Sequence, residues 1–556
     1  MEKIRNNWAL ILSLFIFWLI MVILFILCLI ANAGHFIYAL DDTYIHMALA
    51  KNFSQHGVWG VTKFEFSSSS SSLLYSLLLS LLFLIFGPNE LIPLIINLIF
   101  ANLLICFVYY ILKIKYNLPS YATLVGILSI IFFLPLHSLV FIGMEHTLQV
   151  LINLIFIFKA SKIISEDKLL KRSNLSLEDK KLFFLTPLVS MIRFEGMFLI
   201  IMISFLFLLR KKYFYGLMIA GLGFSPVIIY GCISVTNGWY FLPNPVVLKG
   251  SISDFKYKSL ANGLINFFDP MDIISNPHLL VLFAGALLIL YLHSFKEKKI
   301  QNEIPVLCLI FIGTLLFQKS FAVIKLSGIF LSRYDAYLVA IGIILIFISI
   351  KNNIPQSLSL YALRIFFFEK SKNFEYAFFK IITVFLIIIL FFTPLYYRAY
   401  NTLGNVPQAT NNIYEQQYQM GLFLQKYYQG KCIAANDIGA INYLSDIECL
   451  DIRGLASQDM AEARINDDLD EDFVYKAAKR RDCKIAIIYE DKDYIEIPSE
   501  WVKVGEWEIE NNVVCADDTV SFWAVDPDEV DDLIDHLQDF SRYLPNTVEE
   551  YGNYTK

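Results

Sequence analysis

Two adjacent carboxylates stand where they could do chemistry. Asp41 and Asp42 follow the first long apolar run, residues 8–30, and His46 comes one helical turn after Asp42. Adjacent carboxylates raise the pKa of one of the pair unless a cation intervenes. On a helix, Asp42 and His46 at i, i+4 would share a face. The pattern indicates a general base or a Mg²⁺ or Mn²⁺ site with Asp42 and His46 as ligands. The alternative is that either Asp caps the following helix.

The composition shows that most of this chain needs lipid around it. Hydrophobic residues make up 57% of the 556 residues, and the mean hydropathy is +0.56, whereas soluble domains are about 45–50% apolar. Apolar runs long enough to span a bilayer recur from residue 8 to residue 397 and then stop. We therefore expect a membrane body, residues 1–397, followed by a soluble domain, residues 398–556.

These two parts carry opposite charge. Residues 398–556 hold 32 Asp and Glu against 14 Lys and Arg, a net charge of −18, whereas residues 1–397 hold 19 against 31, a net charge of +12. So acidic a domain is unsuited to nucleic acid or to anionic lipid. The basic residues of the body should mark its cytoplasmic loops.

The basic clusters predict a topology. Residues 8–30 lack a small-residue cleavage site and are typical of a signal anchor with the N-terminus inside. If all basic clusters are cytoplasmic, the chain makes about 11 membrane helices. Residues 398–556 then lie outside the cytoplasmic (inner) membrane. The later spans are expected near residues 91–112, 120–138, 141–159, 213–235, 279–295, 304–320, 335–350 and 380–397.

Three segments of the body do not fit simple crossings. Leu73–Phe86 is too short to span at about 1.5 Å per residue, so we expect a re-entrant or juxtamembrane helix. Residues 183–209 are interrupted by the sequence RFEG and predict a helical hairpin. The six serines at positions 67–72 are typical of a flexible segment or of a cap for the next helix. They end the first outer loop, residues 32–72.

The acidic part alternates helix-like and strand-like segments, which indicates an α/β domain. It contains no glycine-rich phosphate loop, Ser-His-Asp set or zinc spacing, so we expect it to dock or guide an acceptor. Its four cysteines could form two disulfides in three ways or remain free. They are Cys432, Cys449, Cys483 and Cys515. Strands are expected at residues 431–435, 447–452, 483–489 and 521–525, and helices at 412–429 and 471–481.

Six short segments in chain order carry a resemblance to a known family. They are LDDTYIHMALAKNFSQHGVW (40–59), GMEHTL (143–148), IRFEG (192–196), LPNPVVLKG (242–250), SRYDAYL (332–338) and NDIGAINYLSDIECLDIRGLAS (436–457). Together they resemble polyprenyl-phosphate-dependent GT-C membrane glycosyltransferases, in particular the bacterial branch that includes the mycobacterial terminal arabinofuranosyltransferases. The chain departs from that pattern at Ala48, where members commonly have Arg, and at residues 72–75, so the sugar preference does not carry over.

The resemblance implies a polytopic α-helical GT-C fold and an inverting glycosyltransferase. Such an enzyme moves a hexose or pentose from a polyprenyl-phosphate donor to a hydroxyl of a cell-envelope glycan, lipid or protein. It needs a base for that hydroxyl and cations for the departing phosphate. Asp41 is the leading base, with Asp42 as its orienting neighbour or as part of a metal site.

Lys249, Arg333 and Arg193 are the candidate ligands of the donor phosphate. The first two lie in expected outer loops, and Arg193 lies at the tip of the expected hairpin. Basic residues near an interface often serve only as snorkelling anchors. Arg193 could instead pair with Glu195 or Glu145.

Four residues are supporting candidates: His46, Glu145, Glu195 and Asn244. A carboxylate at a membrane interface, such as Glu145, is a functional candidate by default. Asn244 is matched by the resemblance, as is Asp437, but both are also ordinary turn residues.

Three other functions fit a membrane protein of this kind. A transporter or flippase of lipid-linked saccharide would carry charges in mid-helix and inverted repeats, whereas here the charges gather at outer helix ends. An O-antigen polymerase or ligase would use a pyrophosphate-linked donor and a large outer loop in mid-chain. A receptor would use the acidic domain for binding alone.

Overall fold

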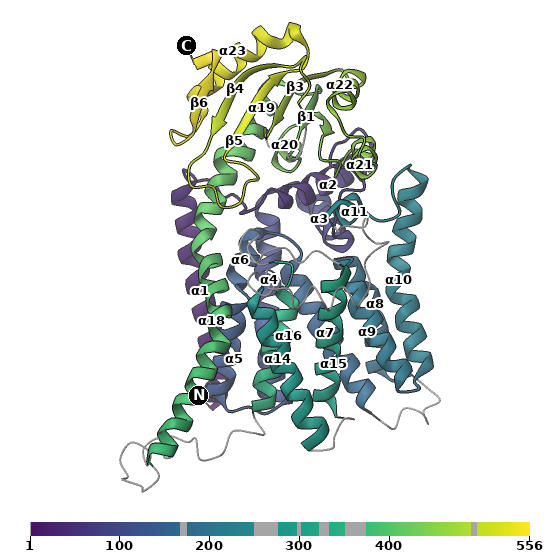
Figure 1. The fold of residues 1–556 in the computed structure, drawn as a ribbon, viewed down its shortest axis with the longest axis vertical. Helices are drawn as coiled ribbons and strands as arrows, with labels where there is room; N and C mark the ends of the chain where they lie inside the picture. Colours follow the sequence, from purple (N-terminus) through teal and green to yellow (C-terminus); the bar gives the residue numbers. More distant parts are fainter. Residues whose placement is uncertain are drawn as a thin grey trace.

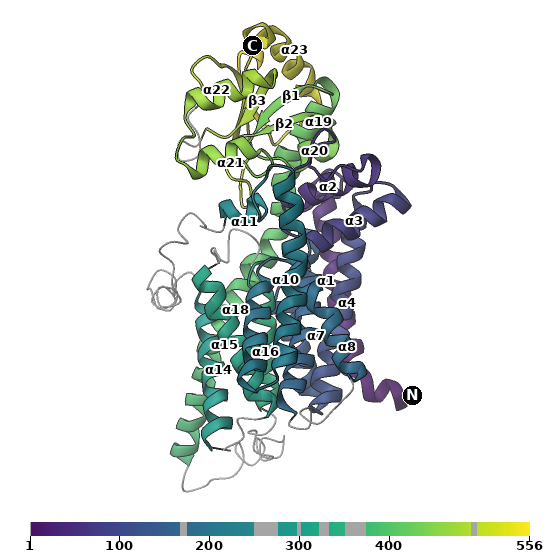
Figure 2. The same cartoon turned by 90° about the vertical axis from the view of Figure 1, so that its right-hand side faces the viewer.

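The computed structural model shows a helical body with a smaller α/β domain at one end (Figure 1). The body helices run roughly along its long axis, and the C-terminus lies on the far side of the α/β domain (Figures 1 and 2). This architecture confirms the predicted fold class. The structure describes residues 2–166, 175–249, 276–296, 302–321, 333–350, 374–490 and 497–555.

Apolar helices build the body. Within the described residues, seven helical stretches are long and apolar enough to cross a membrane. They comprise α1 (Glu2–Ala31), α4 (Leu91–Tyr109) with η1 (Tyr110–Lys115), α5 (Ser120–Phe133) with α6 (Leu136–Ile142), α7 (His146–Ser165), α10 (Tyr213–Thr236), α14 (Pro277–Tyr291) with η4 (Leu292–Lys296), and α15 (Glu303–Phe321). The shorter α16 (Ala336–Ile350) is also apolar. Two of the basic clusters that the predicted topology places in the cytoplasm, KEKK at residues 296–299 and KNN at residues 351–353, lie mainly outside the described residues.

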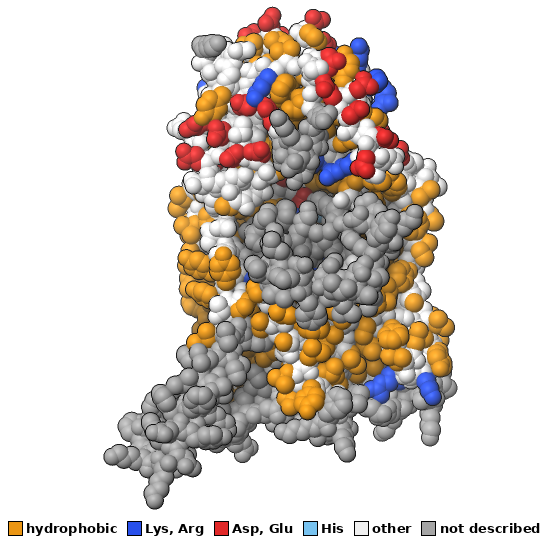
Figure 3. All heavy atoms as spheres, viewed as in Figure 1, with side chains coloured by type: hydrophobic (Ala, Val, Ile, Leu, Met, Phe, Trp, Pro, Cys, Tyr) orange, Lys and Arg blue, Asp and Glu red, His pale blue; other side chains and the backbone are white. Residues whose placement is uncertain are grey.

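The surface of the body suits lipid, and the surface of the α/β domain suits water. Large apolar side chains such as Phe15 of α1 and Leu217 of α10 are exposed. Figure 3 shows hydrophobic side chains along the sides of the body and acidic side chains gathered on the α/β domain. Lys and Arg side chains lie at the opposite end of the body (Figure 3), as the distribution of charge along the sequence predicts.

Two short helices lie between the body and the α/β domain (Figures 1 and 2). They are α2 (Asp42–His56) and α3 (Leu73–Phe86), the latter with the predicted bounds. Five of the six serines before α3 are buried, and the Ser72 hydroxyl accepts from the Tyr75 N–H. The interpretation of the serines as a flexible segment is therefore wrong, and the helix cap is confirmed.

Residues 183–209 form the expected hairpin. Its helices are α8 (Leu177–Ile192) and α9 (Gly196–Leu209), and Arg193 between them has an extended backbone. A Cβ at Gly196 would lie 2.3 Å from the carbonyl oxygen of Val189. Glycine is therefore needed where α9 starts against α8, and this close turn fixes the position of Arg193.

A continuous helix joins the body to the α/β domain. α18 (Phe374–Ile413) contains the expected boundary between residues 397 and 398 and continues through η6 (Tyr414–Tyr418) into α19 (Gln419–Tyr427). Arg398 is buried; it donates to Asp335 Oδ1 over 2.6 Å and to the carbonyl oxygen of Phe133 over 2.7 Å. Asp335 also lies 2.5 Å from His278 Nε2, so a buried ion cluster ties α18 to α14 and to the start of α16.

The α/β domain has one six-stranded sheet in the order β2-β1-β3-β5-β4-β6. The first three strands run parallel and the other pairs antiparallel. The strands are β1 (Cys432–Ala435), β2 (Glu448–Asp451), β3 (Cys483–Ile488), β4 (Val502–Glu508), β5 (Thr519–Ala524) and β6 (Glu549–Gly552). α19 and α23 (Val530–Phe540) pack on one face, and α21 (Gln458–Ile465) and α22 (Glu471–Arg480) on the other.

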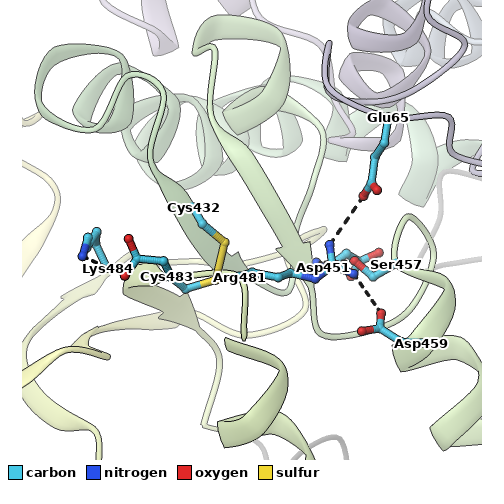
Figure 4. Close-up of a disulfide and its surroundings, with 9 residues drawn as sticks. Glu65, Cys432, Asp451, Ser457, Asp459, Arg481, Cys483 and Lys484 are labelled. Carbon is cyan, nitrogen blue, oxygen red and sulfur yellow. Dashed lines mark hydrogen bonds and ion pairs between the residues drawn. A yellow bond between two sulfur atoms is a disulfide. The ribbon is translucent and has the colours of Figure 1, made fainter. Parts of the chain in front are cut away.

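Two cysteines of the sheet form a disulfide. Cys432 of β1 and Cys483 of β3 are bonded across neighbouring strands (Figure 4). Cys449 and Cys515 are free thiols. The domain thus has one disulfide and two free cysteines, an arrangement between the two alternatives that the sequence leaves open.

Ion pairs hold the α/β domain on the loop at residues 32–72. Lys51 of α2 and Lys63 both lie 3.2 Å from the Asp446 carboxylate, which follows α20 (Ala440–Leu444). Arg481 lies between Glu65 and Asp459 (Figure 4). The domain is therefore fixed against the loop that carries the paired carboxylates.

Candidate active site

Asp41 lies at the junction of the body and the α/β domain. It directly precedes α2, but its side chain makes no capping hydrogen bond to that helix. Instead Oδ2 accepts from the Gly439 N–H over 2.8 Å, and Oδ1 accepts from the Ala440 N–H over 2.7 Å. The contact joins residues 398 positions apart. The structure thus gives Asp41 an orientation set by the other domain.

The surroundings of Asp41 favour its protonated form. Burial raises the pKa of the Asp41 carboxyl, and the charges of Asp437 and Asp42 raise it further. The N–H groups of Ala440 and Gly439 act in the opposite direction without cancelling the increase. A carboxylate with increased proton affinity is better suited to take a proton from a hydroxyl than an ordinary Asp.

Asp42 is held in an ion pair. Its Oδ2 lies 2.5 Å from the guanidinium of Arg333, 291 residues further along the chain. Arg333 is only 2% exposed and also donates to the Tyr334 hydroxyl over 2.9 Å. The two neighbouring carboxylates therefore have different partners, and Arg333 neutralises Asp42.

Arg193 is bound by two glutamates. It donates to Glu145 over 2.6 Å and to the two oxygens of Glu195 over 2.7 and 3.1 Å. Its guanidinium lies 5.4 Å from the centre of the Tyr334 ring, and Arg333 lies 4.9 Å from the same ring. One tyrosine thus places the two arginines close together. The pairing of Arg193 with Glu145 and Glu195 that the sequence offers as an alternative is therefore present. Arg193 and Arg333 nevertheless lie in the same cluster of side chains.

His46 connects α2 to the same cluster. Its Nδ1 lies 2.9 Å from the Ser76 hydroxyl of α3, and its Nε2 lies 3.5 Å from Glu145. Burial lowers the pKa of His46, although Glu145 and Asp42 oppose that effect. Burial alone would raise the pKa of Glu145, but His146, Arg193 and His46 lower it to about 2. Glu145 is therefore ionised, and it compensates the charge of Arg193.

Asp42 and His46 do not fit a metal site. Asp42 bonds to Arg333, whereas His46 bonds to Ser76 and faces Glu145. A guanidinium already compensates Asp42, and its positive charge would repel a second cation. In the part of the chain that the structure describes, no group of three or more His, Cys, Asp or Glu residues could hold a metal ion. The predicted pair of ligands is therefore not formed.

Two further candidates, Asn244 and Lys249, lie on α11 (Asn244–Lys249). The side-chain amide of Asn244 donates to the carbonyl oxygen of Gly454 over 2.7 Å, and its backbone N–H donates to that of Ser68. Asn244 thus links α11 to the α/β domain. The side chain of Lys249 and residues 250–275 lie outside the described structure.

Sequence reasoning missed the residues that the α/β domain adds to this place. Tyr489 and Gln417 lie 2.6 and 2.8 Å from Asp437 Oδ2, beside the turn that contacts Asp41. Asp437 follows the carboxyl end of β1, and Tyr489 follows that of β3. Ligands of α/β sheets commonly bind beyond the carboxyl ends of parallel strands. That rule is the signal in the sequence that could have found Tyr489.

Comparisons with known proteins agree with this architecture. A family model described as a domain of unknown function (DUF8728) matches residues 411–523. A search of curated proteins found no match. The crystal structure of ArnT from Cupriavidus metallidurans bound to undecaprenyl phosphate is 10% identical, with a TM-score of 0.50 over 92% of this chain and 98% of that chain.

A second solved structure has the same degree of likeness. The apo oligosaccharyltransferase of Archaeoglobus fulgidus is 12% identical, with a TM-score of 0.50 over 87% of this chain and 70% of that chain. At such identities the likeness concerns the fold. It confirms the GT-C membrane fold, with a C-terminal sheet domain, for this chain.

Proposed function

We propose that this protein is an inverting glycosyltransferase. It transfers a sugar from a polyprenyl-phosphate donor to a hydroxyl of a cell-envelope glycan, lipid or protein, in cell-wall biogenesis. The observation that carries the proposal is the arrangement of Asp41, a carboxylate with raised proton affinity, beside the Asp42–Arg333 pair and Arg193. A base for the acceptor hydroxyl and cations for the departing phosphate are the two requirements of this reaction, and the two arginines are the candidate cations.

The donor class is supported by the fold and by the charges. The ArnT structure of similar fold was solved with undecaprenyl phosphate. In this chain the two arginines lie at the end of the body next to α2 and α3, with Arg193 5% and Arg333 2% exposed. A lipid phosphate that enters from the membrane would meet these guanidinium groups. The six sequence segments that resemble the arabinofuranosyltransferase branch favour a pentose or hexose bound through one phosphate.

The reaction is a single displacement. Asp41 takes the proton of the acceptor hydroxyl while the acceptor oxygen bonds to the anomeric carbon. The bond from that carbon to the phosphate oxygen breaks, and its electron pair leaves with the polyprenyl phosphate. Arg333 and Arg193 stabilise the charge that develops on this phosphate, and Lys249 is a further candidate. Attack from the face opposite the phosphate inverts the configuration.

We also propose that residues 1–397 form the catalytic membrane domain and that residues 398–556 lie outside the cytoplasmic membrane. The Cys432–Cys483 disulfide supports that side, because disulfides persist in oxidising compartments. In Figure 3 the acidic side chains gather on the α/β domain, whereas the end of the body opposite to it shows Lys and Arg, which agrees with this topology. A lipid-linked donor suits this location, where nucleotide sugars are absent.

The test is sugar transfer in membranes that contain the wild-type chain or Asp41→Asn. A panel of radiolabelled polyprenyl-phosphate sugars is offered with and without EDTA, and label in the envelope fraction is counted. We expect wild-type transfer from one donor and a loss of about 10²–10⁴-fold in Asp41→Asn, the usual contribution of a general base. EDTA should leave the rate unchanged, because Arg333 holds Asp42. Equal rates in wild type and Asp41→Asn would refute the proposal.

A further inference from the structure

The carboxyl edge of the parallel strands meets the first outer loop and α11. The turn at residues 436–440 follows β1, the loop at 452–457 follows β2, and Tyr489 follows β3. The first of these contacts Asp41, and the second contacts Asn244 of α11 through Gly454. The part of an α/β sheet where ligands usually bind is thus directed at the paired carboxylates.

The turn at 436–440 fits Asp41 closely. Both of its consecutive N–H groups, from Gly439 and Ala440, donate to the two carboxyl oxygens of Asp41. A Cβ added at Gly439 would lie 2.2 Å from the backbone oxygen of Asp41 and 2.5 Å from its Oδ2. Only glycine leaves room for the carboxylate at this position.

A hydrogen-bond network keeps the turn in place. Asp437 Oδ2 lies 2.6 Å from the Tyr489 hydroxyl and accepts from Gln417 over 2.8 Å. The Tyr489 N–H donates to the side chain of Asn436 over 2.9 Å. The turn is therefore fixed from β3 and from η6 before it meets Asp41. A preorganised donor pair can hold a carboxylate in one orientation.

We propose that the turn 436–440 is a positioning element of the active site. It holds Asp41 in the orientation in which Asp41 accepts the proton, so that sugar transfer requires the docked α/β domain. This inference rests on the proposed function, and it gives the domain a part in catalysis beyond guiding an acceptor.

Docking alone is a separate property, which other contacts provide. Asp446 pairs with Lys51 and Lys63, and Arg481 pairs with Glu65. None of these pairs includes Asp41. A variant of Asp446 removes two partly exposed pairs but leaves the Arg481–Glu65 pair, so the domain stays docked. It also leaves unchanged the groups that hold the Asp41 carboxylate.

The experiment compares purified full-length wild type with Gly439→Ala and Asp446→Asn in proteoliposomes. Gly439→Ala should lower kcat at least about tenfold with the donor KM unchanged within about twofold, because a misplaced base affects the reaction step and not donor binding. Asp446→Asn should keep kcat within about threefold. Gly404→Ala, where a Cβ meets nothing within 4 Å, controls for substitution itself. A wild-type kcat in Gly439→Ala would overturn the inference and leave the proposed function intact.

Amide hydrogen exchange tests the contact without any activity. The peptide that covers residues 436–444 should exchange about fivefold faster or more in Asp41→Ala than in wild type, because two donors lose their acceptors. Asp446→Asn should leave these two amides protected. Unchanged exchange in Asp41→Ala would overturn the inference even if the enzyme is active. Protected amides in a wild type that consumes no donor would reject the proposed function, and the catalytic part of the inference with it.

Discussion

Asp41 and Asp42 are neighbours in sequence with different surroundings. Asp42 is neutralised by Arg333, and Asp41 accepts two backbone hydrogen bonds from the α/β domain. The sequence predicts Asp41 as the leading base through the family resemblance, but it could not predict the partners of either residue, because these lie 291 and 398 positions away. For the same reason Asp437 resembles an ordinary turn residue until the fold brings it near Asp41.

The pH dependence of transfer should report the proton affinity of Asp41. A base acts when ionised, so kcat/KM rises with pH through its pKa, which burial and Asp437 raise. Asp437→Asn removes the like charge and lowers the pKa of Asp41, so the acid limb of the profile should move to lower pH. Rates measured between pH 4 and pH 10 check this shift, with Asp446→Asn as the matched control. An acid limb at the same pH in Asp437→Asn and in wild type would contradict the assignment of this limb to Asp41.

The Asp42–Arg333 pair makes a prediction for both stability and binding. Arg333→Gln leaves Asp42 without this partner and should cost about 3–5 kcal/mol of unfolding free energy. The double variant Asp42→Asn with Arg333→Gln should regain part of that stability but not the affinity for donor. Donor KM should rise at least about tenfold in both variants, because a charge-assisted bond to phosphate is lost. A wild-type donor KM in the double variant would show that Arg333 does not bind the donor phosphate.

At the scale of elements, the apolar runs predict most of the bundle. The hairpin at 183–209 and the short helix Leu73–Phe86 are found where the sequence places them. The serines at 67–72 were misread because side-chain burial comes from distant partners, as when Ser68 bonds to Tyr230. The sequence does not predict β4 and β6, because charged residues interrupt the apolar pattern of both strands.

The hairpin turn offers a test of how Arg193 is positioned. Gly196→Ala should lower the melting temperature, because its Cβ would meet the Val189 carbonyl oxygen at 2.3 Å. Transfer should fall with it, since α9 would shift away from α8 and move Arg193. The matched control is Gly221→Ala on α10, where a Cβ meets nothing within 4 Å. The measurement is thermal unfolding in detergent. Equal melting temperatures of Gly196→Ala and Gly221→Ala would contradict the prediction.

At the scale of the whole molecule, one helix and several ion pairs join the two parts. α18 runs from the bundle into the α/β domain, and Arg398 within it bonds to Asp335 and to Phe133. The change of composition near residue 398 predicts that the surroundings change there from lipid to water. It could not predict that the backbone remains helical across that point, because both environments accept a helix.

Two measurements test on which side of the membrane the α/β domain lies: mapping of its disulfide and its accessibility to protease. Digestion under non-reducing conditions should yield a peptide pair linked through Cys432 and Cys483, with Cys449 and Cys515 unlinked. Protease added to right-side-out vesicles should cleave within residues 398–556, and protease added to inverted vesicles should not. The reverse pattern of cleavage would place the domain in the cytoplasm and contradict the proposed topology.

The most direct test of the central claim is the anomeric configuration of the product. In a single displacement with Asp41 as base, a donor of known configuration gives a product of the opposite configuration. The measurement is the one-bond carbon–proton coupling of the anomeric centre by NMR, on product made by the purified wild type from a ¹³C-labelled donor. We expect complete inversion. Retention would require a covalent sugar–enzyme intermediate, with a carboxylate acting as nucleophile, and would contradict the role of Asp41 as base.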